Sequence, residues 1–132
     1  MNRASQPGYV CLRISQQYRI VEATGEAGPY KVQTRAYMYS VESEAGQEVF
    51  GYHWHPGTPR TVPWPHMHLE AGAQFAHPDL HRAHFPTGRV SIEEFLRLAV
   101  ETFQLRTRRS DWKSTLNRTQ ALFRRWQTWS SF

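Results

Sequence analysis

The clearest strand pattern in the chain is YKVQTRAYMYSVE, residues 30–42. Its side chains alternate in character: Lys31 and Arg35 stand on one side near the start, and Tyr37 and Tyr39 follow on the same side. Because successive side chains of a β-strand point to opposite faces, this period of two predicts one long strand. One face of the strand is expected to be solvated at its start and aromatic, as part of a core, at its end.

Other strand patterns lie on both sides of this stretch. Residues 9–22 alternate with a change of phase near Gln16, which predicts one strand or two segments joined by a bulge. Residues 48–55 and 66–70 are expected to form a third and a fourth strand, and residues 80–85 form a fifth strand or an irregular edge. We therefore expect four to five strands before any helix.

Two helices are expected after the strands, over about residues 91–104 and 111–128. Ser91 and Glu94 form a capping box at the start of the first helix, and apolar residues follow at helical spacing. The second helix carries a stripe at the same spacing, which we interpret as core, made of Trp112, Leu116, Thr119, Phe123 and Trp126.

Strands first and helices last predict a single α+β domain over residues 1–132. We expect an antiparallel sheet of four to five strands, over about residues 9–85, with the two C-terminal helices packed on one face. A chain of this length buries about two thirds of its unfolded surface. It therefore needs no metal merely to fold.

The composition predicts a cytoplasmic protein. The single cysteine, Cys11, lies in an apolar alternating stretch, so we expect a buried, unreactive thiol. The chain shows no signal-peptide pattern and no apolar run near the roughly 18 residues needed to span a bilayer. No membrane association is expected.

The formal charge of +5 is unevenly distributed. Residues 1–96 hold eight Lys/Arg and nine Asp/Glu, whereas residues 97–132 hold eight Lys/Arg and two acidic residues. A basic segment of this kind suits a nucleic-acid partner, an acidic protein partner or simple solubility.

All seven histidines lie between residues 53 and 84. Four of them form two His-x-His pairs, which are His53 with His55 and His66 with His68. The ten residues between the pairs include four prolines and a glycine, which predicts a surface loop. If the flanking strands pair across this loop, strand alternation brings four imidazoles together.

Such a cluster can bind a metal, transfer protons near neutral pH or receive a phosphate. The sequence lacks the strong metal motifs, which combine histidines with cysteines or follow His-Glu-x-x-His. We therefore interpret the histidines as proton-transfer or phosphate-binding groups in preference to metal ligands. We expect no cofactor. His66 and His68 are the acid/base candidates for RNA cleavage, with His53 and His55 in support.

A phosphate-binding segment is expected beside the cluster. The run from His84 to Arg89 contains a glycine turn and leads into the capped helix, whose N-terminus offers amides and the positive end of the dipole. Thr87 and Arg89 add donors suited to phosphate, and Arg82 and His84 lie nearby in sequence.

The order of these motifs resembles the small TumE-type toxins of bacterial toxin-antitoxin pairs, over about residues 9–103. The likeness is carried by Gly51-Tyr52 with an x-spaced histidine pair, by His84-Phe85-Pro86 and by the helix start Val90-Ser91-Ile92-Glu93-Glu94-Phe95-Leu96. The resemblance matches His66 and His68 to the family's histidine pair. It implies an RNA or nucleotide target and a cognate antitoxin.

The leading hypothesis is a small toxin-like protein that acts on RNA or nucleotides through its histidine cluster, as a metal-independent or weakly metal-assisted ribonuclease or as an RNA-binding protein. One alternative is a non-catalytic protein–protein interaction module, such as an antitoxin-like or defence accessory subunit that docks a small partner protein. Another is a histidine-ligated metalloprotein. The sequence leaves open whether the chain forms a homodimer.

Overall fold

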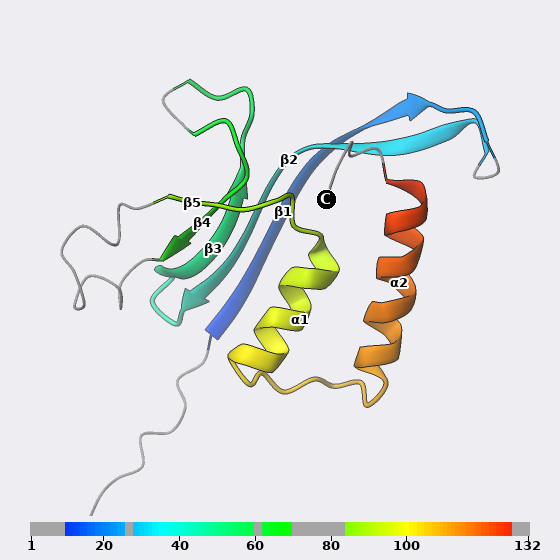
Figure 1. The fold of residues 1–132 in the computed structure, drawn as a ribbon. Coiled ribbons are helices and arrows are strands. Elements are labelled where there is room, and N and C mark those ends of the chain that lie inside the picture. The colour runs from blue at the N-terminus through cyan, green and yellow to red at the C-terminus, as the bar shows by residue number, and fades with distance from the viewer. Residues whose placement is uncertain (1–9, 26–27, 60–61, 70–83, 128–132) are drawn as a thin grey trace, which may run out of the picture.

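The computed structural model describes residues 10–25, 28–59, 62–69 and 84–127, and its strands precede its helices (Figure 1). The elements are β1 (Val10–Glu22), β2 (Tyr30–Ser43), β3 (Glu48–Trp54), β4 (His66–Leu69), β5 (Phe85–Pro86), α1 (Ile92–Thr102) and α2 (Trp112–Trp126). The strands form one antiparallel sheet in sequence order. The predicted α+β fold, with a sheet followed by two C-terminal helices, is confirmed.

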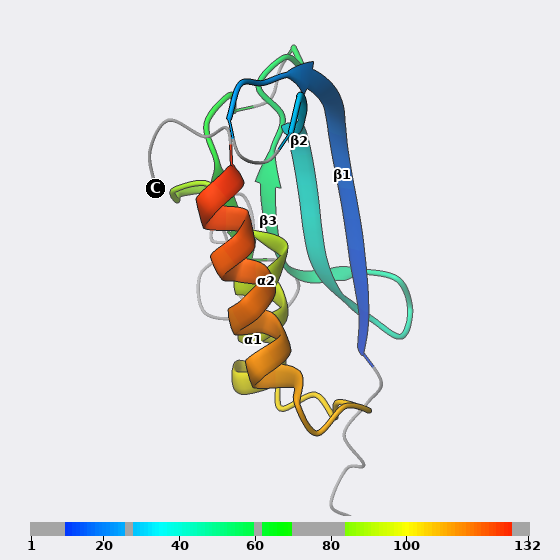
Figure 2. The same cartoon turned by 90° about the vertical axis from the view of Figure 1, so that its right-hand side faces the viewer.

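Both helices lie on the same side of the sheet (Figures 1 and 2). The predicted capping box opens α1: the Ser91 hydroxyl accepts the Glu94 amide, and the Glu94 carboxylate accepts the Ser91 amide. Asp111 is the N-cap of α2, but its carboxylate accepts from Arg109 instead of capping the helix. Each predicted helix was one or two residues too long at its ends.

An aromatic core lies between the sheet and the helices. Tyr37 and Tyr39 on β2 are 2% and 1% exposed, and Phe95 on α1 is fully buried. The rings of Tyr39 and Phe95 are 5.5 Å apart. The Tyr37 hydroxyl accepts the Val90 amide at 2.9 Å, and burial raises the pKa of Tyr37 to about 12. The prediction that the aromatic end of this strand fills the core is confirmed.

Among the described strands, β1 lies at the edge of the sheet and pairs only with β2. Leu12 lies opposite Val41, which belongs to the core, so the even-numbered side chains of β1 point to the helix side. Cys11 points to the other face and is exposed. The prediction of a buried Cys11 is wrong, because the alternation was read in the opposite phase and because no strand of the described residues lies beyond this edge.

A bulge interrupts the pairing of β1 and β2, but it does not lie in residues 9–22, where the change of phase near Gln16 predicted it. Gln17 pairs with Ala36 and Tyr18 pairs with Thr34, so the extra residue is Arg35. The bulge therefore lies in β2, and alternation continues unbroken along β1.

The third strand is shorter than predicted, because β3 ends before His55. β4 is described from His66 to Leu69, and residue 70 of the predicted strand lies outside the described residues. The proline-rich loop contains no helix or strand in its described parts, residues 56–59 and 62–65. Most of the predicted fifth strand, residues 80–83, lies outside the described residues. Neither helix in the described part of the chain is long and apolar enough to cross a membrane.

We expect Phe95→Ala to lower the free energy of unfolding by about 3–5 kcal/mol, because a fully buried ring leaves a cavity between α1 and the sheet. Urea denaturation followed by circular dichroism measures this loss. Leu122→Ala is the control, because Leu122 is 52% exposed and its truncation should change stability by no more than about 0.5 kcal/mol. Equal effects of the two substitutions would contradict the position of the core.

Candidate functional site

Histidine rings from three neighbouring segments meet on the helix-free face of the sheet. His53 on β3 is the register partner of His66 on β4, and His68 lies two residues further on the same face. The His68 ring centre lies 4.4 Å from that of His53, 4.8 Å from that of His66 and 4.6 Å from that of His84. His55 lies at the margin, 5.6 Å from His53. The predicted convergence of the two His-x-His pairs is confirmed.

Strand alternation explains why the histidine side chains lie on the helix-free face of the sheet and not in the aromatic core. Tyr52 and Trp54 face the helices and pack with the core, so His53 between them must point to the other face. On β4 the same alternation sends Met67 toward the core and His66 and His68 toward the helix-free face. Each strand therefore contributes to the core through one face and to the cluster through the other.

The hydrogen bond of His66 determines which of its nitrogens faces the cluster. Nδ1 lies 2.8 Å from the Trp64 carbonyl oxygen. Because a carbonyl only accepts, Nδ1 carries the proton, and in the neutral ring Nε2 carries the lone pair. That Nε2 lies 3.0 Å from Nε2 of His68. One ligand nitrogen each from His53, His66 and His68 lies within 4.8 Å of the others.

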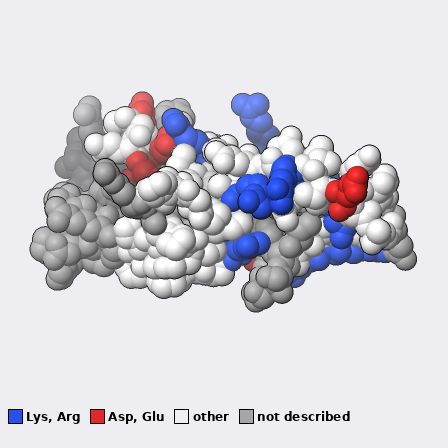
Figure 3. Space-filling view, turned by 90° about the horizontal axis from the view of Figure 1, so that it is seen from above, with Lys and Arg blue, Asp and Glu red and all other residues white. Residues whose placement is uncertain are grey.

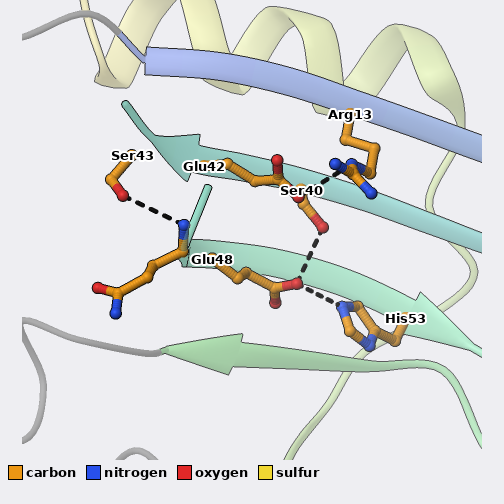
Figure 4. Close-up of polar contacts among 7 residues, drawn as sticks. Arg13, Ser40, Glu42, Ser43, Glu48 and His53 are labelled. Carbon is orange, nitrogen blue, oxygen red and sulfur yellow. Dashed lines mark hydrogen bonds and ion pairs between the residues drawn. The ribbon is translucent and has the colours of Figure 1, made fainter. Parts of the chain in front are cut away.

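Glu48 adds a carboxylate to this cluster (Figure 4). Its Oε2 accepts a hydrogen bond from Ser40 Oγ at 2.9 Å and lies 3.1 Å from Nε2 of His53. Its Oε1 is buried and has no hydrogen-bond partner in the described structure. When His53 donates its Nε2 proton to this carboxylate, Nδ1 becomes the nitrogen with the lone pair.

Sequence analysis missed Glu48 because of a bulge. Glu48 and His53 are five positions apart, and in a regular strand an odd separation puts side chains on opposite faces. Here Phe50 pairs with Val41 and Glu48 pairs with Glu42, so Val49 is the extra residue and the alternation is reversed. Gly51 was the available signal, because a glycine inside a strand often marks a close approach.

Burial keeps His66 and His68 neutral at physiological pH. It lowers the pKa of His66, and it lowers that of His68 to about 4 with help from the charges of neighbouring histidines. Burial also lowers the pKa of His55. Burial of Glu48 acts to raise its pKa, but the hydrogen bond and charge of His53 outweigh it, so the pKa of Glu48 is lowered. The site thus combines neutral His66 and His68 with an ionised carboxylate.

The predicted phosphate-binding segment is divided between the two faces. The Arg89 guanidinium lies 4.1 Å from the centre of the Trp54 ring, on the helix side. Among the described residues of the segment, only His84 reaches the other histidines. Thr87 donates its amide to a carbonyl of the proline-rich loop. Arg82 lies outside the described residues.

Two amides expected to meet a phosphate at the start of α1 are used within the fold. The Val90 amide donates to Tyr37, and the Ser91 amide donates to Glu94. Phosphate binding by Thr87 and Arg89 stays a prediction. Arg89 lies on the opposite side of the sheet from the histidine cluster.

Basic side chains are concentrated on the helical part. Figure 3 shows a group of them near the middle of the view, with acidic side chains toward both ends. α2 contributes Lys113, Arg118, Arg124 and Arg125. On the helix-free face, Arg13 is paired with Glu42 at 3.0 Å. The excess of basic residues near the end of the sequence therefore lies on the helix side of the sheet, away from the histidines.

Comparisons of the chain with protein-family models, with curated proteins and with solved structures found no match. The resemblance to the TumE-type toxins therefore stays a prediction. So do the RNA or nucleotide target and the cognate antitoxin that it implies.

Gly51→Ala should destabilise the protein by about 1–3 kcal/mol, because the new methyl group would lie 2.7 Å from Cδ of Glu48 and 2.9 Å from Nε2 of His53. In a Glu48→Ala background the same substitution should cost less, since most of the obstruction is gone. Denaturation of the single and double variants measures this coupling. Gly57→Ala, where a methyl group meets nothing within 4 Å, is the control. Additive effects at the two positions would contradict the role of Gly51.

Proposed function

We propose that the protein binds one divalent transition-metal ion through His53, His66 and His68 and uses it to hydrolyse a phosphodiester. The observation that carries the proposal is the convergence of three imidazole nitrogens within 4.8 Å of one another. Neutral imidazole is a ligand for zinc, copper, iron and nickel. The sequence alone favoured proton transfer over metal binding as the role of the histidines. The proposal favours metal binding instead.

The contacts around the ligands support metal coordination. Metal-binding histidines usually donate their second ring N–H to a carboxylate or a backbone carbonyl, which orients the ring. His53 has Glu48 in this position, and His66 has the Trp64 carbonyl. Both partners come from this chain's own fold, so the rings are held in place before any ion arrives.

The separation of His66 and His68 favours shared coordination over a metal-free acid/base pair. A general acid and a general base on either side of a phosphodiester need space for the phosphate between them, and these two Nε2 atoms are 3.0 Å apart. Two nitrogens bound to one zinc ion at tetrahedral angles lie about 3.3 Å apart. The observed spacing is close to that value.

Three protein ligands leave a coordination position for water, as in catalytic zinc sites. Binding to a metal makes water more acidic, so hydroxide is available near neutral pH. An ion held by His53, His66 and His68 would supply this hydroxide for attack on phosphorus, and the oxygen that leaves with the electron pair of its P–O bond would need a proton. His84 is exposed beside His68 and is placed to carry that proton.

Two features support RNA or a nucleotide as the substrate. Trp64 is 40% exposed, and its ring lies 5.5 Å from that of His66, so a base can stack beside the proposed centre. The resemblance of the sequence to the TumE-type toxins implies the same class of target.

Protein purified without a histidine tag is expected to bind one equivalent of Co²⁺ and to show the visible absorption of tetrahedral cobalt. His66→Ala and His68→Ala should abolish that absorption, because each removes one of three ligands. His55→Ala should retain it, since His55 lies outside the ligand group. Elemental analysis and circular dichroism accompany each variant. Binding by all three variants, or by none of the proteins including the wild type, would contradict the site.

Zinc-loaded protein should cleave a single-stranded RNA, and chelation should stop the reaction until zinc is restored. His68→Ala should lower the rate by at least about 100-fold, because the charge stabilisation supplied by the ion is lost. His55→Ala serves again as the matched control. Cleavage that survives chelation would support a metal-independent ribonuclease instead. If the protein binds the metal but cleaves no RNA, the proposed hydrolysis is overturned and the proposed metal site is not.

A further inference from the structure

In the described part of the chain, the outer edge of β1 is the longest open edge of the sheet. β1 is 13 residues long and pairs with a described strand on one side only, whereas β5, at the other edge, has two residues. Figure 2 shows β1 at the margin of the sheet, beyond the two helices. A long edge strand presents a row of backbone N–H and C=O groups to any strand that can lie beside it.

An apolar stripe runs along the same edge on the helix side. In the part of the chain that the structure describes, six of the eight exposed large hydrophobic side chains lie on β1 and β2. They are Leu12, Ile14, Tyr18, Ile20, Tyr30 and Val32. Tyr18 and Ile20 are 61% and 66% exposed, and Val32 lies directly opposite Ile20. Such a patch beside an open edge is typical of an interface.

We propose that this edge is covered by a second copy of the chain, whose β1 pairs antiparallel with the first to give one continuous sheet. Two identical strands that pair antiparallel are related by a two-fold axis, so the same surface serves both partners. The proposal is independent of the metal centre, which lies on β3 and β4.

The sequence of β1 fits this two-fold pairing. With Gln17 on the axis, Ile14 lies opposite Ile20 of the second copy, and Ser15 lies opposite Arg19. Arg13 then faces Val21, so no like charges oppose each other. A register centred on Gln16 would put Arg13 opposite Arg19 of the second copy, and the repulsion disfavours it. We therefore infer the register centred on Gln17.

The symmetry also determines where the other parts of the dimer lie. The two-fold axis of such a pair is perpendicular to the sheet, so both helical layers lie on one side and both histidine clusters on the other. The apolar stripes of the two copies then meet side by side between the helical layers. Pairing would remove from water both the backbone edge and the stripe.

Light scattering on the full chain over a wide range of concentrations tests the interface. The wild type is expected to have the mass of two chains rather than the 15.5 kDa of one. Ile14→Lys and Ile20→Lys should shift the protein to monomers, because each puts a charge at the centre of the contact. Leu122→Lys, an equally polar change at an exposed position on α2, should leave the dimer intact. A monomeric wild type, or a dimer that survives both β1 substitutions, would overturn the proposal.

A cysteine at the axis tests the register. Cys11→Ser combined with Gln17→Cys places one thiol of each copy beside the other, so mild oxidation should give a covalent dimer that reduction reverses. Thr24→Cys in the same background lies in the exposed turn after β1 and should crosslink far less. Equal crosslinking at the two positions would contradict the pairing centred on Gln17.

Discussion

The pairing of His53 with His66 across β3 and β4 is the contact on which the site depends. β4 has only four residues, and its register with β3 determines whether its histidines reach the helix-free face or point into the core. The proline-rich loop joins the two strands but contributes no helix or strand in its described parts. Pairing of the strands, rather than the loop, therefore brings the imidazole nitrogens together.

The same two strands also contribute to the core. One face of each strand packs in the core, and the opposite face carries the histidine cluster. Tyr52 packs with Phe95 of α1, whereas His53, its neighbour in sequence, contacts Glu48 on the opposite face. Side chains of the cluster are polar and held by hydrogen bonds, and those of the core are aromatic and held by burial. Substitutions in one group can therefore change the protein's chemistry while leaving most of its packing in place.

Much of this arrangement followed from the period of the side chains. Alternation predicted the second strand, the convergence of the histidine pairs and the aromatic core, because each depends only on the two faces of a strand. Cys11 was placed wrongly because an edge strand has no neighbour to bury either of its faces fully. Arg89 was expected beside the histidines, but proximity in sequence does not say on which side of the sheet a side chain lies after a strand ends.

Glu48 could not be found from alternation, because the bulge at Val49 reverses it. That bulge has a consequence for recognising other chains that carry this site. If the five-residue spacing between Glu48 and His53 were kept in a regular strand without the bulge, the carboxylate would point toward the aromatic core, where an ionised group is poorly tolerated. The distinguishing pattern is thus Glu-x-x-Gly-x-His on one strand and His-x-His on the next, in which the spacing carries more information than the histidine content.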